Sequence, residues 1–289
     1  TNDLLQYDSA IKEYSEKLSD HRRDNISLKY FQYLAVLFAE IYLDRYFNRK
    51  QELLSELNYF LYEYKQQERI AISSFEEKDL KKLAYWMATG SGKSLIVVKL
   101  ISILHTLIHR NQIPDFPFLI LTHREDLIWQ FEKLVEKYNK SNEAKIRLHS
   151  LKTFGLNYYL NGGSGGSDKT HIDVYIYRSD LIAEVSKEKE ISFQEIENEG
   201  KWYLFLDEAH KGDKDDSIRK LYYSIMTRNG FLFNFSATFT DDWDIFTTVF
   251  NFNLGKYIDA GYGKNICIFK KNLVFSKNTI QNKNKNTIQ

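Results

Sequence analysis

The sequence has few of the residues that crosslink or interrupt a fold. Its 289 residues include one cysteine (Cys267), two prolines and 13 glycines. A single cysteine excludes an internal disulfide and a cysteine-based zinc finger, and it favours a reducing compartment. The scarcity of Pro and Gly, together with 15% aromatic residues, excludes a flexible linker protein and predicts a chain rich in regular elements.

The sequence also lacks an excess of charge of either sign. Lys and Arg number 40 and Asp and Glu number 39, which gives a formal net charge of +1. This balance excludes a histone-like protein that coats polyanions, but it is compatible with a local basic groove.

No segment has the pattern of a signal peptide or of a membrane span. Residues 1–30 are charged and contain no apolar stretch ahead of a small-residue cleavage site. The longest apolar stretch, Leu95 to Ile108, contains Lys99 and His105 and is too short to cross a bilayer. We therefore predict a soluble, cytoplasmic protein without a membrane partner. Because the chain does not begin with methionine, we expect its natural start to lie upstream.

The chain has two parts that differ in their sequence pattern. Residues 1–80 carry helical patterns at Tyr30–Leu43 and Glu52–Tyr64, which predict a helical N-terminal extension with a helical hairpin. In residues 81–275 short apolar runs alternate with helical patterns, which indicates an α/β domain with a parallel sheet and helices on both faces. The expected strands are Leu83–Met87, Phe116–Leu121, Val174–Tyr177, Trp202–Leu206 and Phe231–Phe235. Residues 161–169 are expected to form a flexible loop, and residues 276–289 a disordered tail.

The strongest motif has the composition of a phosphate loop. Residues 87–94 read Met-Ala-Thr-Gly-Ser-Gly-Lys-Ser and lie between an apolar run and a helical pattern. In such a loop the backbone N–H groups converge on phosphate oxygens at the N-terminal end of a helix. The residues expected to bind ATP are Thr89, Gly90, Ser91, Gly92, Lys93 and Ser94, with Lys93 on the β- and γ-phosphates and Ser94 on Mg²⁺. Met87 occupies the first glycine position of the strict pattern, and a Gly-Ser turn before a buried helix is the alternative interpretation.

A second motif places two carboxylates after an apolar run. Asp207-Glu208-Ala209-His210 directly follows Trp202–Leu206. Adjacent carboxylates at the end of a buried strand are costly unless a cation or a reacting group uses them. We expect Asp207 to hold Mg²⁺ and Glu208 to orient and deprotonate the attacking water. An acidic cap on the following helix is the alternative.

The order of the motifs resembles that of a known family. Phe231–Phe235 is followed by Ser236-Ala237-Thr238, so a phosphate loop, Asp-Glu-Ala-His and Ser-Ala-Thr each follow an apolar strand. This order resembles the first RecA-like domain of DEAH-type superfamily 2 helicases and translocases. The amino-acid sequence of the loop is most similar to that of the motor subunits of type III and type I restriction enzymes. In that branch Met is common at the position of Met87. The resemblance implies that His210, Ser236 and Thr238 couple the acidic motif to the rest of the motor.

The resemblance also implies contacts with nucleic acid and with the base of the nucleotide. Residues 121–130 are similar to motif Ia of that branch, and residues 176–181 lie where a further contact loop is expected. The expected contacts with the nucleic-acid backbone come from strand ends, which mix cations with short hydroxyls: Thr122, His123, Arg124, Arg178 and Ser179. Surface salt bridges are the alternative for the two arginines. Gln32 is similar to the glutamine that reads adenine, and a polar position on a packed helix is its alternative.

A motor of this type also needs a second RecA-like domain and an arginine finger, and we find neither in the sequence. No Arg follows Arg228, and about fifty residues follow the Ser-Ala-Thr segment, too few for a second α/β domain. We therefore expect the ATP-binding domain of a DNA helicase or translocase of restriction or defence type, inactive or slow without a second RecA-like domain and its arginine finger. The alternative is a stand-alone, nucleotide-dependent protein-binding module without motor activity, with the apolar helix at Tyr30–Leu43 as its partner surface.

Overall fold

The computed structural model describes residues 28–66, 72–155, 170–207, 216–239 and 241–263, together with positions 5, 8, 9, 11, 12 and 158. Its longer helices are α2 (Tyr30–Asn48), α3 (Lys50–Lys65), α4 (Lys93–His109), α5 (Glu125–Ser141) and α8 (Asp216–Met226). Shorter helices are α7 (Phe193–Ile196), α9 (Asp242–Phe246) and α10 (Leu254–Asp259), and the 3-10 turns are η1 (Glu77–Lys81), η2 (Leu151–Thr153), η3 (Ser179–Leu181) and η4 (Asn198–Gly200). None of the described helices is long and apolar enough to cross a membrane.

The centre of the molecule is a seven-stranded sheet in which every neighbouring pair is parallel, in the order β3-β4-β2-β7-β8-β1-β9. The strands are β1 (Lys82–Met87), β2 (Phe118–Thr122), β3 (Lys145–Ser150), β4 (His171–Arg178), β7 (Tyr203–Asp207), β8 (Phe231–Ser236) and β9 (Thr248–Phe252). A separate two-stranded sheet pairs β5 (Ile182–Ala183) with β6 (Ile191–Ser192). Because all seven strands are parallel, their carboxyl ends meet at one edge, where this type of sheet places its ligands.

Apolar side chains alternate between the two faces of the sheet. Phe118 and Ile120 of β2 join the larger core cluster, to which α2, α4 and α5 contribute. Leu119 and Leu121 join a second cluster that includes Tyr222 and Met226 of α8. A parallel strand buried on both faces reads as a continuous apolar run, which is why the five expected strands are confirmed in the structure.

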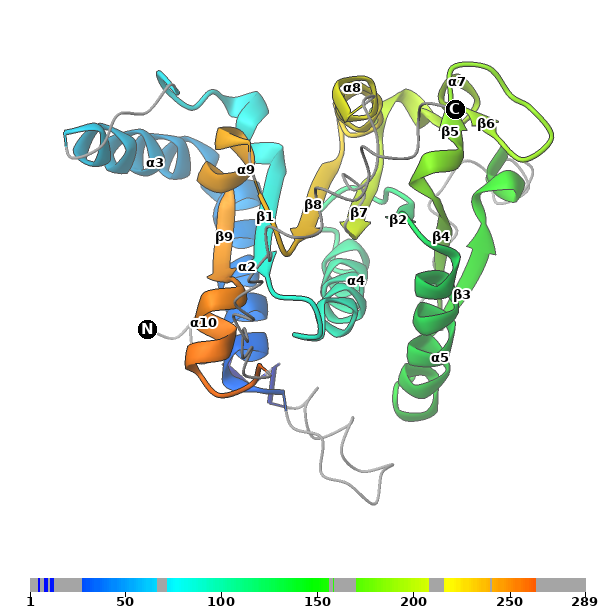
Figure 1. Cartoon of the computed structure of the whole chain (residues 1–289), viewed down its shortest axis with the longest axis horizontal. Coiled ribbons are helices and arrows are strands. Elements are labelled where there is room, and N and C mark those ends of the chain that lie inside the picture. The colour runs from blue at the N-terminus through cyan, green and yellow to red at the C-terminus, as the bar shows by residue number, and fades with distance from the viewer. Residues whose placement is uncertain are drawn as a thin grey trace, which may run out of the picture.

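The two helices expected near the N-terminus are confirmed, but they do not form a hairpin. Arg49 separates α2 from α3, and Figure 1 shows α3 turning away from α2 instead of folding back along it. Helix α2 lies beside β9 at one end of the sheet and buries Phe31, Val36 and Leu43 in the larger core. The extension and the sheet therefore share one core, and α2 is fixed beside β9, the neighbour of the strand that leads into the phosphate loop.

Candidate nucleotide site

The predicted phosphate loop is a tight turn between β1 and α4 (Figure 1). Gly90 and Gly92 have φ angles of 82° and 86°, in the left-handed region that favours glycine. A Cβ atom at residue 92 would also overlap the Gln32 side chain. Helix α4 begins at Lys93, so the backbone N–H groups of its first turn face this loop and carry the positive end of the helix dipole.

Met87 and Ser91 show how the loop departs from the strict pattern. Met87 is the last residue of β1, is fully buried, and pairs in register with Phe252 of β9. The first glycine position of the pattern is therefore a strand position here, and an apolar residue suits it. Ser91 is 1% exposed, and its hydroxyl has no hydrogen-bond partner in the described part of the chain. Lys93 is 8% exposed and thus lies within the site, not on the outer surface.

Gln32 lies against the phosphate loop although it is far from the loop in sequence. Its side-chain Nε2 donates to the Ser91 carbonyl at 2.8 Å, and its Oε1 accepts from the Lys29 N–H at 3.0 Å. The residue is 8% exposed in the first turn of α2. Gln32 thus joins the start of α2 to the loop, a contact that the separation of 59 positions did not indicate.

Tyr257 is a neighbour of the loop that sequence reasoning missed. Its hydroxyl donates to the Gly90 carbonyl at 3.4 Å from α10, beyond the last expected strand. The ring belongs to an aromatic group with Phe31, Phe252 and Tyr262, in which Phe31 and Phe252 stack at 4.4 Å. No motif marks Tyr257, because its role depends on the strand order that places β9 beside β1.

The acidic motif reaches the same edge of the sheet. Asp207 is the last residue of β7 and is 4% exposed. Glu208 and His210 lie outside the described residues, so their expected roles stay predictions. Ser236 ends β8, the strand between β7 and β1, and its hydroxyl bonds to both the N–H and the carbonyl of Thr238 at 2.9 Å. This closed turn holds the Ser-Ala-Thr segment between the acidic strand and the strand of the phosphate loop.

The residues expected to contact nucleic acid gather at the ends of β2 and β4. Thr122 pairs in register with Arg178 on one side and with Asp207 on the other. Thr122 and Ser179 are at most 1% exposed, and their hydroxyls lack hydrogen-bond partners in the described structure. The side chain of His123 is partly buried, with Nδ1 likewise unpartnered among the described residues. The short side chains therefore line the inside of this edge.

Each of the two arginines there is held by a carboxylate two positions later. Arg124 makes a forked contact with Asp126 at 2.8 and 2.6 Å. Arg178 contacts Asp180 at 3.1 and 2.6 Å, and Glu125 lies 3.6 Å away. The hydrogen bond to Asp180 raises the pKa of Arg178 above its ordinary value. The contacts of both arginines thus match the salt-bridge alternative. Their guanidinium groups are partly exposed, so each can also bind a phosphate oxygen.

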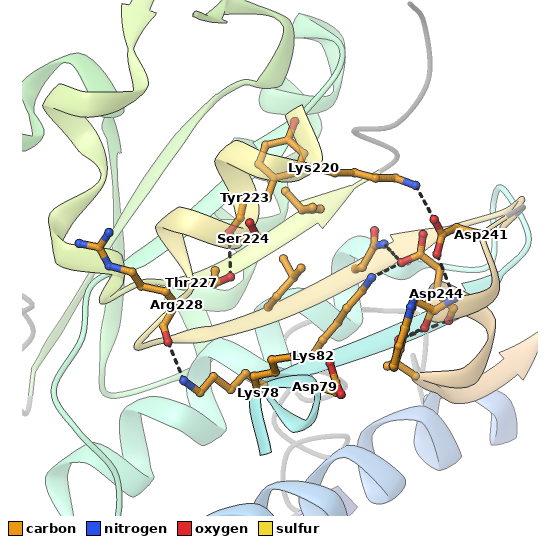
Figure 2. A pocket seen from close by; sticks show the side chains of 16 residues that line it. Lys78, Asp79, Lys82, Lys220, Tyr223, Ser224, Thr227, Arg228, Asp241 and Asp244 are labelled. Carbon is orange, nitrogen blue, oxygen red and sulfur yellow. Dashed lines mark hydrogen bonds and ion pairs between the residues drawn. The ribbon is translucent and has the colours of Figure 1, made fainter. Parts of the chain in front are cut away.

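A cavity of about 540 Å³ lies at the opposite end of β1 (Figure 2). Its lining includes Lys82, the first residue of β1, which pairs with Asp244 of α9. Asn234 of β8 also donates to Asp244 at 3.0 Å, and Lys220 of α8 pairs with Asp241 at 2.9 Å (Figure 2). The carboxylates at this wall therefore have partners already, and the cavity is separate from the phosphate loop.

Comparison with known proteins gives one family. A family model described as "Type III restriction enzyme, res subunit" matches residues 58–241. The matched segment includes the phosphate loop, Asp207 and the Ser-Ala-Thr segment, whereas Gln32 and Tyr257 lie outside it. No curated protein matches the chain.

Proposed function

The chain belongs to the family of the type III restriction enzyme res subunit, with a helicase-type ATP-binding domain, and on this premise we propose that it powers movement along duplex DNA with Mg-ATP. The protein would act in the cytoplasm as part of a restriction or defence system. A second RecA-like domain or a partner subunit would complete the motor by adding an arginine finger to the ATP site.

The observation that carries the proposal is the turn between β1 and α4. Two glycines in the left-handed region, a buried lysine and the N-terminus of a 17-residue helix meet at one point of the sheet edge. This arrangement suits a bound polyphosphate, because the backbone N–H groups and the helix dipole both favour negative charge. The unpartnered Ser91 hydroxyl adds a further donor there.

The donor set also fits a magnesium ion, provided that a nucleotide is bound. The described residues contain no cluster of three or more His, Cys, Asp or Glu side chains that could hold a metal. Mg²⁺ is usually held by one or two carboxylates together with substrate phosphates. In our proposal Asp207 and Ser94 would hold the ion, which would supply charge neutralisation at the phosphates, and Lys93 would bind the β- and γ-phosphates.

Hydrolysis would depend on the residues that follow Asp207. We assign the orientation and deprotonation of water to Glu208, and the coupling to the Ser-Ala-Thr segment to His210, Ser236 and Thr238. The position of β8 between β7 and β1 supports this coupling, because it places Ser236 between the acidic strand and the phosphate loop.

The nucleic-acid contacts would lie at the neighbouring strand ends. We assign contacts with the DNA backbone to Arg124 and Arg178, and we assign positioning of their loops to Thr122, His123 and Ser179. The register of Thr122 with both Arg178 and Asp207 supports this assignment, because it joins the two sites along one edge.

The test is nucleotide binding and turnover by the full chain and by two variants. Wild-type protein is expected to bind Mg-ATP, and Lys93→Ala to weaken binding by about tenfold or more, since a charge-assisted contact with phosphate is lost. Glu208→Gln should retain binding and lose the residual hydrolysis, because the base is gone while the phosphate contacts remain.

Duplex DNA is added in a parallel series. We expect duplex DNA to stimulate ATP hydrolysis weakly or not at all in the chain alone, and strongly when a second motor domain or partner subunit is supplied. ATP binding that is unchanged by Lys93→Ala would contradict the proposal, and so would fast turnover that survives Glu208→Gln.

A further inference from the structure

Three successive carbonyl groups of the phosphate loop are held by hydrogen bonds. Tyr257 of α10 donates to the Gly90 carbonyl at 3.4 Å. Gln32 of α2 donates to the Ser91 carbonyl at 2.8 Å. The third carbonyl, at Gly92, accepts from N–H groups in the first turn of α4. Two of the three donors are therefore side chains from helices that are distant from the loop in sequence.

The N–H groups of the same loop remain available to a ligand. Gly90 and Gly92 have positive φ angles, whereas Ser91 between them does not. Successive N–H groups in a backbone that alternates in this way form a concave anion site. Among the residues that the structure describes, no acceptor bonds to the N–H of Gly90 or Gly92. A loop whose carbonyls are held and whose N–H groups are open is oriented for phosphate oxygens.

The amide of Gln32 is fixed at both of its polar atoms. Oε1 accepts from the Lys29 N–H at 3.0 Å while Nε2 bonds to the Ser91 carbonyl, and the residue is 8% exposed. The amide also occupies the space where a Cβ on Gly92 would lie, so it packs directly on the loop backbone. Rotation of the amide toward a base would break both hydrogen bonds. Gln32 is therefore placed to act on a nucleotide through the loop.

Tyr257 is supported by the same part of the core as Gln32. Its ring packs against Phe31, Phe252 and Tyr262, with centroid distances of 6.2, 6.0 and 5.8 Å. Phe31 directly precedes Gln32 in α2, so one aromatic group holds both side chains against the loop. The contact of the Tyr257 hydroxyl is longer than the usual O–H···O distance of about 2.7–2.8 Å, so we expect it to contribute less than the amide.

We propose that Gln32 and Tyr257 are positioning residues that orient the phosphate loop, and that Gln32 acts on the phosphates and not on the base of the nucleotide. By holding the carbonyls of Ser91 and Gly90, the two side chains keep the open N–H groups turned toward the phosphates. This inference rests on the proposed function, because it requires a polyphosphate in the loop. The effect of both residues then does not depend on the presence of a base.

The experiment is titration of the full chain with Mg-ATP and, separately, with inorganic tripolyphosphate, which has no base. Gln32→Met keeps the length of the side chain and removes the donor, so it should weaken the binding of both ligands by the same factor of about ten. Tyr257→Phe keeps the ring and should weaken both by about two- to fivefold. The ratio of the two affinities does not depend on how much of a variant is folded.

Two matched controls lose similar bonds elsewhere. Gln51→Met removes an amide of α3 that donates to the side chain of Glu77, and Tyr42→Phe removes a hydroxyl that donates to the Leu80 carbonyl at 3.0 Å. Neither contact involves the phosphate loop. Both controls should bind ATP and tripolyphosphate as wild type does.

Lys93→Ala separates a failure of this inference from a failure of the proposed function. It should weaken the binding of both ligands by about tenfold or more, and unchanged binding would contradict the proposed function itself. If Lys93→Ala weakens binding but Gln32→Met does not, the inference alone is overturned. A loss of affinity for ATP without a loss for tripolyphosphate in Gln32→Met would show that Gln32 reads the base. Equal affinities of Tyr257→Phe and Tyr42→Phe would overturn the role of Tyr257.

Discussion

Gly92 meets two requirements at one backbone position. Its φ of 86° disfavours any residue with a Cβ, and the Gln32 amide occupies the space where that Cβ would lie. The left-handed conformation costs other residues about 1–2 kcal/mol. A side chain at this position therefore strains the loop and also displaces the contact between Gln32 and Ser91.

We predict that Gly92→Ala lowers the free energy of unfolding by about 1–3 kcal/mol and weakens ATP binding by about tenfold or more. Denaturant unfolding and nucleotide titration measure the two effects. In a Gln32→Ala background, Gly92→Ala should lower the free energy of unfolding by less than it does in wild type. The new Cβ then no longer overlaps the Gln32 side chain, while the strain in φ stays. Gly155→Ala, which meets nothing within 4 Å, is the control. If Gly92→Ala lowers the free energy of unfolding equally in wild type and in Gln32→Ala, the overlap with Gln32 does not contribute.

Glu40 is a second residue whose surroundings can be tested directly. Burial raises the pKa of its carboxyl from 4.5 to about 7, and Lys99 opposes the rise. The folded chain therefore binds this proton more tightly than the unfolded chain does. Its contribution to stability is greatest below about pH 4.5 and declines as the pH rises to about 7, where the buried carboxylate ionises.

We therefore predict that Glu40→Gln becomes more stable relative to wild type as the pH rises from 4.5 to 7. The relative gain should be roughly 3 kcal/mol at most, since each unit of pKa shift corresponds to about 1.4 kcal/mol. Urea unfolding at a series of pH values measures it. A constant difference between the two proteins across this range would show that Glu40 titrates normally.

At the level of elements, β1 is held at both of its ends. Its last residue leads into the phosphate loop, and its first residue, Lys82, pairs with Asp244 of α9, to which Asn234 of β8 also donates (Figure 2). The Asp244 side chain is 10% exposed, whereas the nearby pair of Lys220 and Asp241 is 50% and 38% exposed. Buried pairs lose much more than exposed pairs when one partner is removed.

We predict that Asp244→Ala lowers the free energy of unfolding by about 2–4 kcal/mol, because Lys82 and Asn234 are left without their acceptor. Lys220→Ala should change it by less than about 1 kcal/mol. Thermal or urea unfolding of the two variants makes the comparison. Similar losses from both would mean that burial does not separate these ion pairs.

The sequence predicted the central strands better than the edges of the sheet. β2, β7 and β8 are buried on both faces and read as apolar runs, whereas β3 alternates Ile146 and Leu148 with Lys145 and Arg147 and was not expected as a strand. β9 (Thr248–Phe252) was not among the expected strands either. An edge strand buries one face, so its signal is shorter and weaker.

Helix α2 shows that the sequence also did not predict which apolar residues are buried and which form an exposed surface. Its apolar residues offered a surface for a partner protein, but the structure buries Phe31, Ala35 and Leu43 in the core beside β9. On α2 the aromatic residues Tyr30 and Phe38 stay exposed, and α3 exposes Tyr59, Phe60 and Tyr62. Within the candidate site, the sequence was enough to predict a glycine turn between β1 and α4, whereas the positions of Gln32 and Tyr257 beside that turn depend on tertiary packing.

For the whole molecule, the near-neutral charge limits how tightly the chain alone can hold DNA. The net charge is +1, and Arg124 and Arg178 each share their charge with a carboxylate. Each phosphate that a protein neutralises contributes about −0.9 to the slope of log affinity against log salt concentration. Two such contacts are far fewer than the six to ten or so of tight, strongly salt-dependent DNA binders.

We predict that duplex DNA binding by the chain is weak and falls by about tenfold between 50 and 200 mM salt. Removing both arginines, as Arg124→Ala with Arg178→Ala, should abolish this salt dependence. Arg228→Ala, which lines the cavity at the other end of β1, should leave it unchanged. Fluorescence anisotropy with labelled duplex measures all three proteins. A slope as steep as that of six or more contacts would require another basic surface.

The strand order also determines when the phosphate loop can form during synthesis. β1 pairs only with β8 and β9, and Trp86 bonds to the Ala237 carbonyl, 151 positions later. At about 5–20 residues per second, the ribosome delivers these partners some 8–30 s after the loop itself. Until then β1 has no strand with which to pair. The emerging β1 is thus exposed to aggregation and chaperones over this interval, and the loop that follows it can hold a nucleotide only after β8 and β9 have left the ribosome.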